Sequence, residues 1–407
     1  MELFGLFLAL AVIIFVASKW HEIIYALLLG IAIIIVFSSM PISLVISTFT
    51  DVAFSPSIIS LTIIVLLITL FSSVMYKTLL FDKLLKSLIG LLKSIHVLVA
   101  AIPAIVGLLA VPGGSIMSAP FVDQLGNRIN MPAHHKSAAN TFYRHILLFF
   151  NPLAPMLIVI ADLSTLGFLP IMKFHLIPVI VTLIIGHIVL KRLCPHESRE
   201  PDISTNHSFT TSLKNVLYAG LPLMVAIVLA LAFNVNFIIS LAIAITLTII
   251  FDFTGDRILK ISDIKPIFIK GINWKLGLSV FIIMVFGEFI KASGAIPILA
   301  QIITDSNMSL LLILLLSSVI VGIASGHPIV GAAILYPIFL PLVGDSVAYL
   351  SLIFTGMMLG YMVSPVHLCL IVSNEYFKTN YLGINKLLFP LQALLTLVAI
   401  AVAILLY

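Results

Sequence analysis

Long apolar runs, separated by short polar segments, follow one another along the whole chain. Each run has about the length that a helix needs to cross the hydrocarbon core of a bilayer, roughly 17–25 residues. Two further regions are apolar but interrupted by proline, glycine and polar residues, near 96–168 and 309–373. The uninterrupted runs lie near 2–18, 21–38, 57–76, 172–190, 215–233, 236–251, 273–290 and 386–406. The pattern predicts an all-α polytopic membrane protein.

Composition supports a membrane location. Of the 407 residues, 61% are hydrophobic and 9% are charged, whereas soluble domains carry roughly a quarter charged residues. The mean hydropathy is +1.26, too high for a soluble fold to bury. We therefore expect a multi-pass protein of the plasma membrane whose partner is the lipid bilayer. The net charge of +5 reflects basic loops and does not indicate nucleic-acid binding.

The two halves of the chain show the same pattern at one constant offset in residue number. At this offset Asn151 corresponds to Ser364, and Gly113 corresponds to Gly326. The run 57–76 likewise falls on the apolar residues that follow position 270. This agreement predicts an internal duplication, with an N-terminal repeat at 1–191, a cytoplasmic linker at 192–214 and a C-terminal repeat at 215–407.

Lysine and arginine predict the orientation, because cytoplasmic loops carry an excess of both. If the loop that carries Lys77 and Lys93 is cytoplasmic, 19 of the 21 basic residues lie inside, and only Lys173 and Lys291 lie outside. This count requires 96–128 to enter the membrane and return to the same side. Each half then has five crossings plus one re-entrant hairpin, and the odd number makes the repeats inverted.

Each repeat is predicted to contain a scaffold part and a part built from a hairpin and a broken helix. The amphipathic segment 77–95, with lysines on one face, is typical of an interfacial arm between them. The remaining boundaries are scaffold spans within 1–76, hairpin 96–128, broken helix 132–168 and span 172–191 in the first repeat, and hairpin 309–345 and broken helix 347–373 in the second.

Four interruptions at membrane depth predict the functional site. The hairpin tips read VPGGSIMSAP and IASGHPIVGAA, and the later breaks read NPLAP and SPVHL. Non-helical backbone is tolerated there only where it is buried in protein or lines a cavity, and helix N-termini attract anions. The predicted substrate-binding residues are Gly113, Gly114, Ser115, Asn151, Pro152, Ser325, Gly326, His327, Ser364, Pro365 and His367.

These phrases, with the continuation SPVHLCLIVSNEYF, resemble the ion transporter superfamily. That superfamily includes citrate and gluconate permeases, dicarboxylate/sodium symporters and the large membrane subunit of TRAP transporters. The likeness is strongest to an uncharacterised integral-membrane family within it and covers almost the whole chain. It implies two inverted repeats, an elevator motion of the hairpin-bearing part and a homodimer. The tips carry PGGS and SGHP in place of the Ser-Asn-Thr signature of the dicarboxylate/sodium branch.

The expected function is secondary active transport of a small organic anion, a carboxylate or sugar acid, coupled to H⁺ or Na⁺. The coupling candidates are His327 for a proton and the oxygens of Ser115, Asn151, Ser325 and Ser364 for Na⁺. No cofactor, no metal beyond Na⁺ and no enzymatic activity are expected, because the chain lacks the motifs for hydrolysis or ATP binding. The alternatives are a Na⁺/H⁺ antiporter and the membrane subunit of a binding-protein-dependent transporter.

Several polar residues allow two interpretations. His327 and His367 would either contact substrate or only hydrogen-bond the bends. Arg144 is either a cation for the substrate or an anchor at the membrane interface. Glu288 is either a functional intramembrane acid or the partner of Lys291 one helical turn away. Cys194 and Cys369 lie in unrelated contexts and suggest neither a disulfide nor a metal site.

Overall fold

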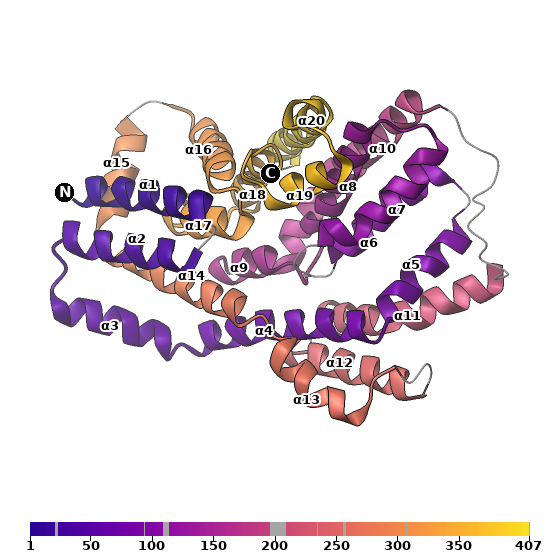
Figure 1. Ribbon diagram of the computed structural model, residues 1–407. Helices are drawn as coiled ribbons and strands as arrows, with labels where there is room; N and C mark the ends of the chain where they lie inside the picture. The colour runs from indigo at the N-terminus through magenta and orange to yellow at the C-terminus, as the bar shows by residue number, and fades with distance from the viewer. Residues whose placement is uncertain are drawn as a thin grey trace.

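The computed structural model describes residues 1–20, 23–92, 94–108, 114–195, 209–233, 235–254, 258–305 and 308–406, and over these ranges it contains helices and no strands. Figure 1 shows the helices in chain order. The first half contains α1 (Glu2–Trp20), α2 (Ile23–Phe37), α3 (Ile42–Ala53), α4 (Pro56–Lys77), α5 (Leu80–Leu91), α6 (Ile95–Leu108), α7 (Gly114–Arg128), α8 (Ala133–Ile146), η1 (Leu147–Phe149), α9 (Pro155–Leu163) and α10 (Phe168–Leu193).

The second half repeats this order of long and short helices. It contains α11 (Phe209–Leu231), α12 (Phe237–Thr254), α13 (Ile261–Lys270), α14 (Trp274–Ala292), α15 (Ala295–Asp305), α16 (Leu310–Ser325), α17 (Pro328–Val343), α18 (Val347–Met362), α19 (Leu368–Phe377) and α20 (Tyr381–Leu406). The starts of α9 and α10 precede those of α19 and α20 by one and the same offset, which is also the offset between Asn151 and Ser364 in the sequence.

The helix contacts repeat in the same way. The contacts α1–α2, α6–α8 and α7–α19 have the counterparts α11–α12, α16–α18 and α17–α9. Contacts between the halves follow the same rule, since α2 packs on α14 as α12 packs on α4. In each of these named pairs, exchanging the two halves gives the counterpart, so these contacts occur in both halves.

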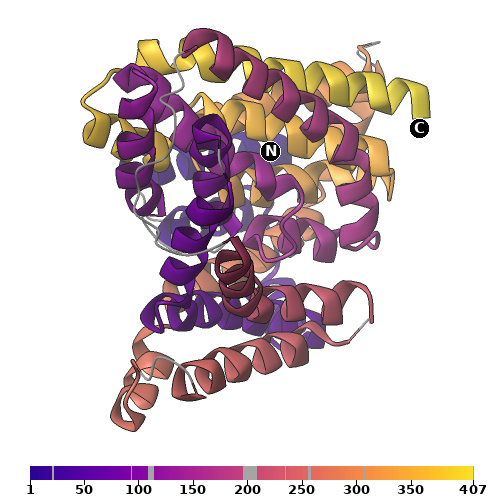
Figure 2. The same ribbon diagram turned by 90° about the vertical axis from the view of Figure 1, so that its right-hand side faces the viewer.

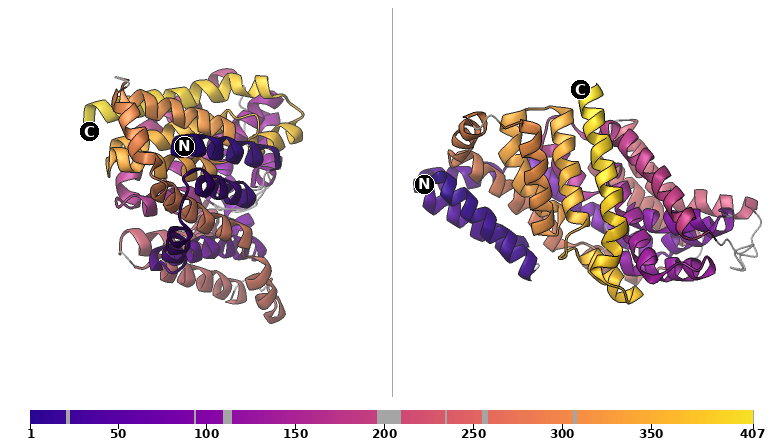
Figure 3. Two further views of the ribbon diagram at one scale, coloured as in Figure 1. Left: turned by 90° about the vertical axis from the view of Figure 1, so that its left-hand side faces the viewer. Right: turned by 90° about the horizontal axis from the view of Figure 1, so that it is seen from above.

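The helices form two groups. In Figures 1 and 2, α4, α11, α12 and α13 run along the lower side, while α6 to α10 and α16 to α20 lie above them. Seen from above in Figure 3, α16, α18, α20 and α10 lie side by side, in agreement with the contacts between successive members of this row. The upper group therefore contains both hairpins and both broken helices.

Three helices were not expected from the apolar runs. They are α3, α13 and α15, each too short to cross a membrane, because a helix rises only about 1.5 Å per residue. The helix α15 occupies the place in the second half that α5 occupies in the first, because α15 contacts α1 as α5 contacts α11. Each half therefore has an arm before its hairpin, and only the lysine-rich first arm was visible in the sequence.

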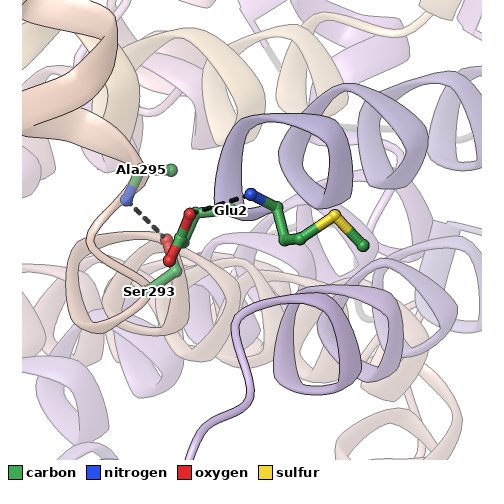
Figure 4. Close-up of polar contacts among 4 residues, drawn as sticks. Glu2, Ser293 and Ala295 are labelled. Atoms are coloured by element: carbon green, nitrogen blue, oxygen red, sulfur yellow. Dashed lines mark hydrogen bonds and ion pairs between the residues drawn. The ribbon is translucent and has the colours of Figure 1, made fainter.

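The turn into α15 lies beside the chain start. Ser293 accepts a hydrogen bond from the Ala295 amide at 3.2 Å through its side-chain oxygen, and the amino group of Met1 pairs with Glu2 at 3.1 Å. Figure 4 shows both interactions together, at the end of α14 and the start of α1. The short polar cap allows the chain to turn sharply and place α15 against α1.

Much of the outer surface is apolar. Within the part of the chain that the structure describes, four helices of at least 18 residues are long and apolar enough to cross a membrane, namely α4, α10, α11 and α20. Further apolar helices in this part are 10 to 17 residues long. Large side chains such as Phe4, Leu217 and Leu397 are 58%, 64% and 64% exposed. A water-soluble monomer rarely exposes so many large apolar side chains, so this surface fits contact with lipid.

Two hydrogen bonds connect residues that are far apart in the sequence. In each case, the distribution of lysine and arginine predicts that both residues lie on the same side of the membrane. His96 contacts the Cys194 carbonyl at 2.7 Å, both on the predicted inner side. The Thr165 amide donates to Asp345 at 3.2 Å, both on the predicted outer side. The alternation of loops and the assignment of the cytoplasmic side stay predictions from the lysines and arginines.

This orientation can be tested with introduced cysteines. Cys194 itself is a poor reporter, because it is 2% exposed and burial raises the pKa of its thiol, which lowers the reactive thiolate fraction. In a protein without native cysteines, we expect Arg192→Cys to react with an impermeant maleimide only in inside-out vesicles. Phe54→Cys should react only in intact cells, and the reverse pattern for the pair would invert the orientation.

Candidate functional site

The second break in each half is fastened to the hairpin of the same half. The Asn151 side-chain amide donates to the carbonyl of Leu108, near the end of α6, at 3.0 Å. The Ser364 hydroxyl donates to the carbonyl of Ile323, near the end of α16, at 2.6 Å. Two different side chains therefore each satisfy a carbonyl near the end of a hairpin helix, which would otherwise lack a partner.

The same side chains also shape the breaks. The side-chain oxygen Oδ1 of Asn151 accepts a hydrogen bond from the backbone amide of Leu153 at 3.0 Å. The hydroxyl oxygen of Ser364 accepts one from the backbone amide of Val366 at 3.3 Å. Side chains of this kind stabilise turns by bonding to an amide two residues later. Asn151 and Ser364 thus hold the hairpin and the later break of their own half together. Each side chain keeps part of its hydrogen-bonding capacity for a ligand.

The second hairpin tip requires glycine. Gly326 has φ +55°, and a Cβ placed on it would lie 2.4 Å from Cγ2 of Val366 and 2.9 Å from its carbonyl oxygen. Ser325 donates to the carbonyl of His327 at 3.3 Å, so the tip also bonds to itself. Backbone of tip and break can approach this closely only because position 326 has no side chain.

The first tip is described in part. Pro112 and Gly113 lie outside the described residues, and Gly114 begins α7. Ser115, one residue later, is 1% exposed, and its hydroxyl has no hydrogen-bond partner among the residues that the structure describes. A buried hydroxyl in this state is an exception in native proteins, and it lies where the sequence predicted a ligand.

A polar network joins the first tip to the second half. The Asn140 amide on α8 donates to the Ser115 carbonyl at 3.0 Å and to the Ser373 hydroxyl of α19 at 3.2 Å. The hydroxyls of Ser137 and Ser373 are 2.9 Å apart. Residues from both repeats therefore contribute to one buried network between α7, α8 and α19.

Arg144 lies one helical turn beyond Asn140 on α8. It is 9% exposed, its Nη1 has no hydrogen-bond partner, and it forms no ion pair with any described carboxylate. The side chain is largely buried in the protein, which disfavours the interpretation as an interfacial anchor. A buried guanidinium without a counter-ion is costly, and an anionic ligand would reduce that cost.

Two histidines and a tyrosine meet beside Arg144. The rings of His145 and His367 have centroids 4.8 Å apart, and those of Tyr361 and His367 are 3.9 Å apart. His367 is fully buried, and His145 is 4% exposed. The sequence predicted His367 as a site residue, but it gave no signal for Tyr361, which lies at the end of the helix before the second break.

The two halves differ in side-chain chemistry at three equivalent positions on α8 and α18. In the second half, the positions equivalent to Asn140, Arg144 and His145 are Ile353, Met357 and Met358. These three are buried among apolar side chains. At these three positions the helix contacts repeat between the halves, but the polar and cationic side chains of α8 have apolar counterparts on α18.

The remaining predicted residues are placed as follows. Pro152 is buried at the first break, Pro365 is exposed at the second, and His327 is the N-cap of α17 and half-buried. Glu288 pairs with Lys291 at 2.6 Å, the structural alternative of the two considered. The structure places Ser364 and Gly326 together, and links Ser115 to the second half through Asn140.

A cleft of about 630 Å³ opens on the predicted outer side. It lies between α3, α4 and α14 on one wall and the end of α9 on the other. Its charged lining consists of Asp51, Asp162, Glu288 and Lys291. Since Glu288 is paired with Lys291, two further carboxylates give this cleft a negative charge.

The architecture is that of a polytopic helical membrane protein of a known transporter fold. The solved structure of the YdaH transporter of Alcanivorax borkumensis matches with a TM-score of 0.60 and 15% sequence identity, over 88% of this chain and 86% of that chain. The family model described as "Protein of unknown function (DUF401)" matches residues 3–406, and the chain belongs to this family. No curated protein matches the chain.

Proposed function

We propose that the protein is a secondary active transporter of a small organic anion, a carboxylate or sugar acid, in the plasma membrane. The observation that carries this proposal is Arg144, a buried cation with no counter-ion among the described residues, placed on α8 beside the second break. The fold shared with the YdaH transporter supports transport as the activity. Membership of the ion transporter superfamily, with paired inverted repeats, is part of the proposal.

An elevator motion is the mechanism that the two helix groups favour. The upper group holds both hairpins and both broken helices. Its helix α9 contacts α4 of the lower group, and its helix α17 contacts α14, which itself packs on α4. The arms α5 and α15 precede the hairpins and provide the connections along which the upper group would slide. The polar network around Asn140, together with Arg144 one helical turn away on α8, then marks the path by which an anion would reach the cytoplasm.

Coupling to a proton is proposed for His327. Histidine changes charge in the physiological range, and a cation at the tip would strengthen anion binding reciprocally. We expect substrate affinity to fall as pH rises from about 5.5 to 8, and His327→Gln to flatten that dependence. Affinity is measured by thermal shift of the purified protein, after a screen of carboxylates, sugar acids and inorganic anions with and without Na⁺.

Sodium coupling predicts a different result. In that case Na⁺ binds oxygens near Ser115, Asn151, Ser325 and Ser364, and uptake requires a Na⁺ gradient. Uptake into proteoliposomes with an imposed pH or Na⁺ gradient separates the two mechanisms. Strict Na⁺ dependence combined with an unaffected His327→Gln variant would end the proton hypothesis.

One observation favours the second candidate, a Na⁺/H⁺ antiporter. The outer cleft carries Asp51 and Asp162 in addition to the Glu288–Lys291 pair, and negative charge attracts cations to a cleft. An antiporter would acidify or alkalise proteoliposomes in response to Na⁺ with no organic anion present. The anion transporter would move protons or Na⁺ only together with its substrate.

A further inference from the structure

We propose that His145, His367 and Cys369 bind a thiophilic divalent metal ion of the Zn²⁺ type. The side chains come from the end of α8 in the first repeat and the start of α19 in the second. One ligand atom from each of them lies within 4.8 Å of the others. This proposal does not depend on which substrate is transported, because it rests on these three side chains alone.

The hydrogen bond of His145 prepares it as a ligand. Its Nδ1 lies 2.7 Å from the Thr141 carbonyl oxygen, and since a carbonyl can only accept, Nδ1 carries the proton. The lone pair of His145 is then on Nε2, where it accepts a hydrogen bond from the Tyr361 hydroxyl at 3.3 Å, and a metal ion would displace this bond. Metal-binding histidines usually donate their other ring nitrogen to a carbonyl or carboxylate in this way.

His367 gives independent support. It is fully buried, and neither of its ring nitrogens makes a well-aligned hydrogen bond with a described residue, although the Cys369 thiol lies close enough to interact with the ring. A buried polar group without a partner costs about 1–3 kcal/mol, and few native side chains are left in that state. A metal ion bound to one nitrogen would supply the missing interaction, while the packing of Tyr361 against the ring holds its orientation.

The donor types select the class of ion. Thiolate and imidazole suit Zn²⁺ and related transition metals, whereas Na⁺, Mg²⁺ and Ca²⁺ prefer oxygen. Zinc bond lengths of about 2.0–2.3 Å in a tetrahedral site require the three donors to close by about 1 Å, which side-chain rotation allows. Three protein ligands leave one position open, as in zinc sites that bind water or a substrate.

Cobalt(II) provides a direct spectroscopic test. The untagged protein is first assayed for bound metal by mass spectrometry, then stripped with a chelator and titrated with Co²⁺. We expect one Co²⁺ per chain, with tetrahedral d–d bands and a thiolate-to-cobalt charge-transfer band that Zn²⁺ abolishes. Cys369→Ser should lose the charge-transfer band, and His367→Gln should weaken Co²⁺ binding at least tenfold.

Cys194→Ser is the matched control, because it removes the other cysteine, which lies at the distant end of α10. Its Co²⁺ spectrum should match that of the wild type. The same variant gives a second measurement in which the cluster is intact: Zn²⁺ should slow the reaction of Cys369 with maleimide. A stripped wild-type protein without a thiolate–cobalt band, or Cys369 unprotected by Zn²⁺ in Cys194→Ser, would overturn the proposal.

Discussion

Arg144→Gln is expected to weaken binding of the transported anion by about 10- to 150-fold, the equivalent of roughly 1.5–3 kcal/mol for a lost charge-assisted hydrogen bond. Arg144 is buried on α8 with no described counter-ion, so the anion is its natural partner. Affinity is measured by thermal shift with the carboxylate or sugar acid that stabilises the wild-type protein most. Arg144→Lys should retain part of the affinity, because the charge remains.

Arg192→Gln is the control for net charge, since Arg192 is exposed at the end of α10. It should bind the anion like the wild type. A buried arginine with a purely structural role would give a different result in Arg144→Gln, namely a lower melting temperature with unchanged affinity. That outcome would contradict the proposed anion site.

Gly326→Val is expected to abolish uptake while the protein still inserts and can be purified. The new side chain would meet Val366 in the second break, and the φ of +55° disfavours any β-branched residue. Tip and break would be forced apart at the place where Ser364 fastens the break to α16. Uptake into proteoliposomes and the melting temperature are measured together.

Gly344→Val is the control that distinguishes backbone strain at a positive φ from the steric clash with Val366. Gly344 has φ +58°, yet a Cβ there would have nothing within 4 Å. This variant should therefore show the strain of a positive φ but keep uptake. In addition, Val366→Ala should partly restore uptake to Gly326→Ala, since it removes the nearest clashing atom. Equal loss of uptake in both glycine variants would mean that the tip contact is unimportant.

The sequence predicted those parts of the fold that depend on the length and spacing of apolar segments. The spans, the two hairpins and the repeat offset follow from apolar runs and from glycines and prolines at fixed positions. The short helices α3, α13 and α15 were missed because their length gives no membrane signal, and packing against α14, α4 and α1 determines them. Helix α11 also begins at Phe209, inside the segment 192–214 expected to be a linker.

The sequence predicted where the helices of the candidate site are interrupted, but not which polar side chains meet there. Asn151, Ser364 and Gly326 stand at breaks that a sequence reader can find, because proline and glycine interrupt helices there. His145 and Cys369 stand in different halves of the chain, and no local spacing indicates that they meet. Arg144 looked like an ordinary basic residue near a helix end, since burial cannot be read from one sequence.

By itself, the sequence determined the membrane class and the positions of the breaks, and it predicted the duplication and the alternation of loops. These features depend on how apolar each segment is and on where glycine and proline interrupt a helix, and both can be read from residues that are close together in the sequence. The tertiary structure alone decided that α8 and α19 meet, that Arg144 lies there without a described counter-ion, and that the polar network lies between α7, α8 and α19. Such contacts join residues from different repeats, and only the packing of the whole chain brings them together.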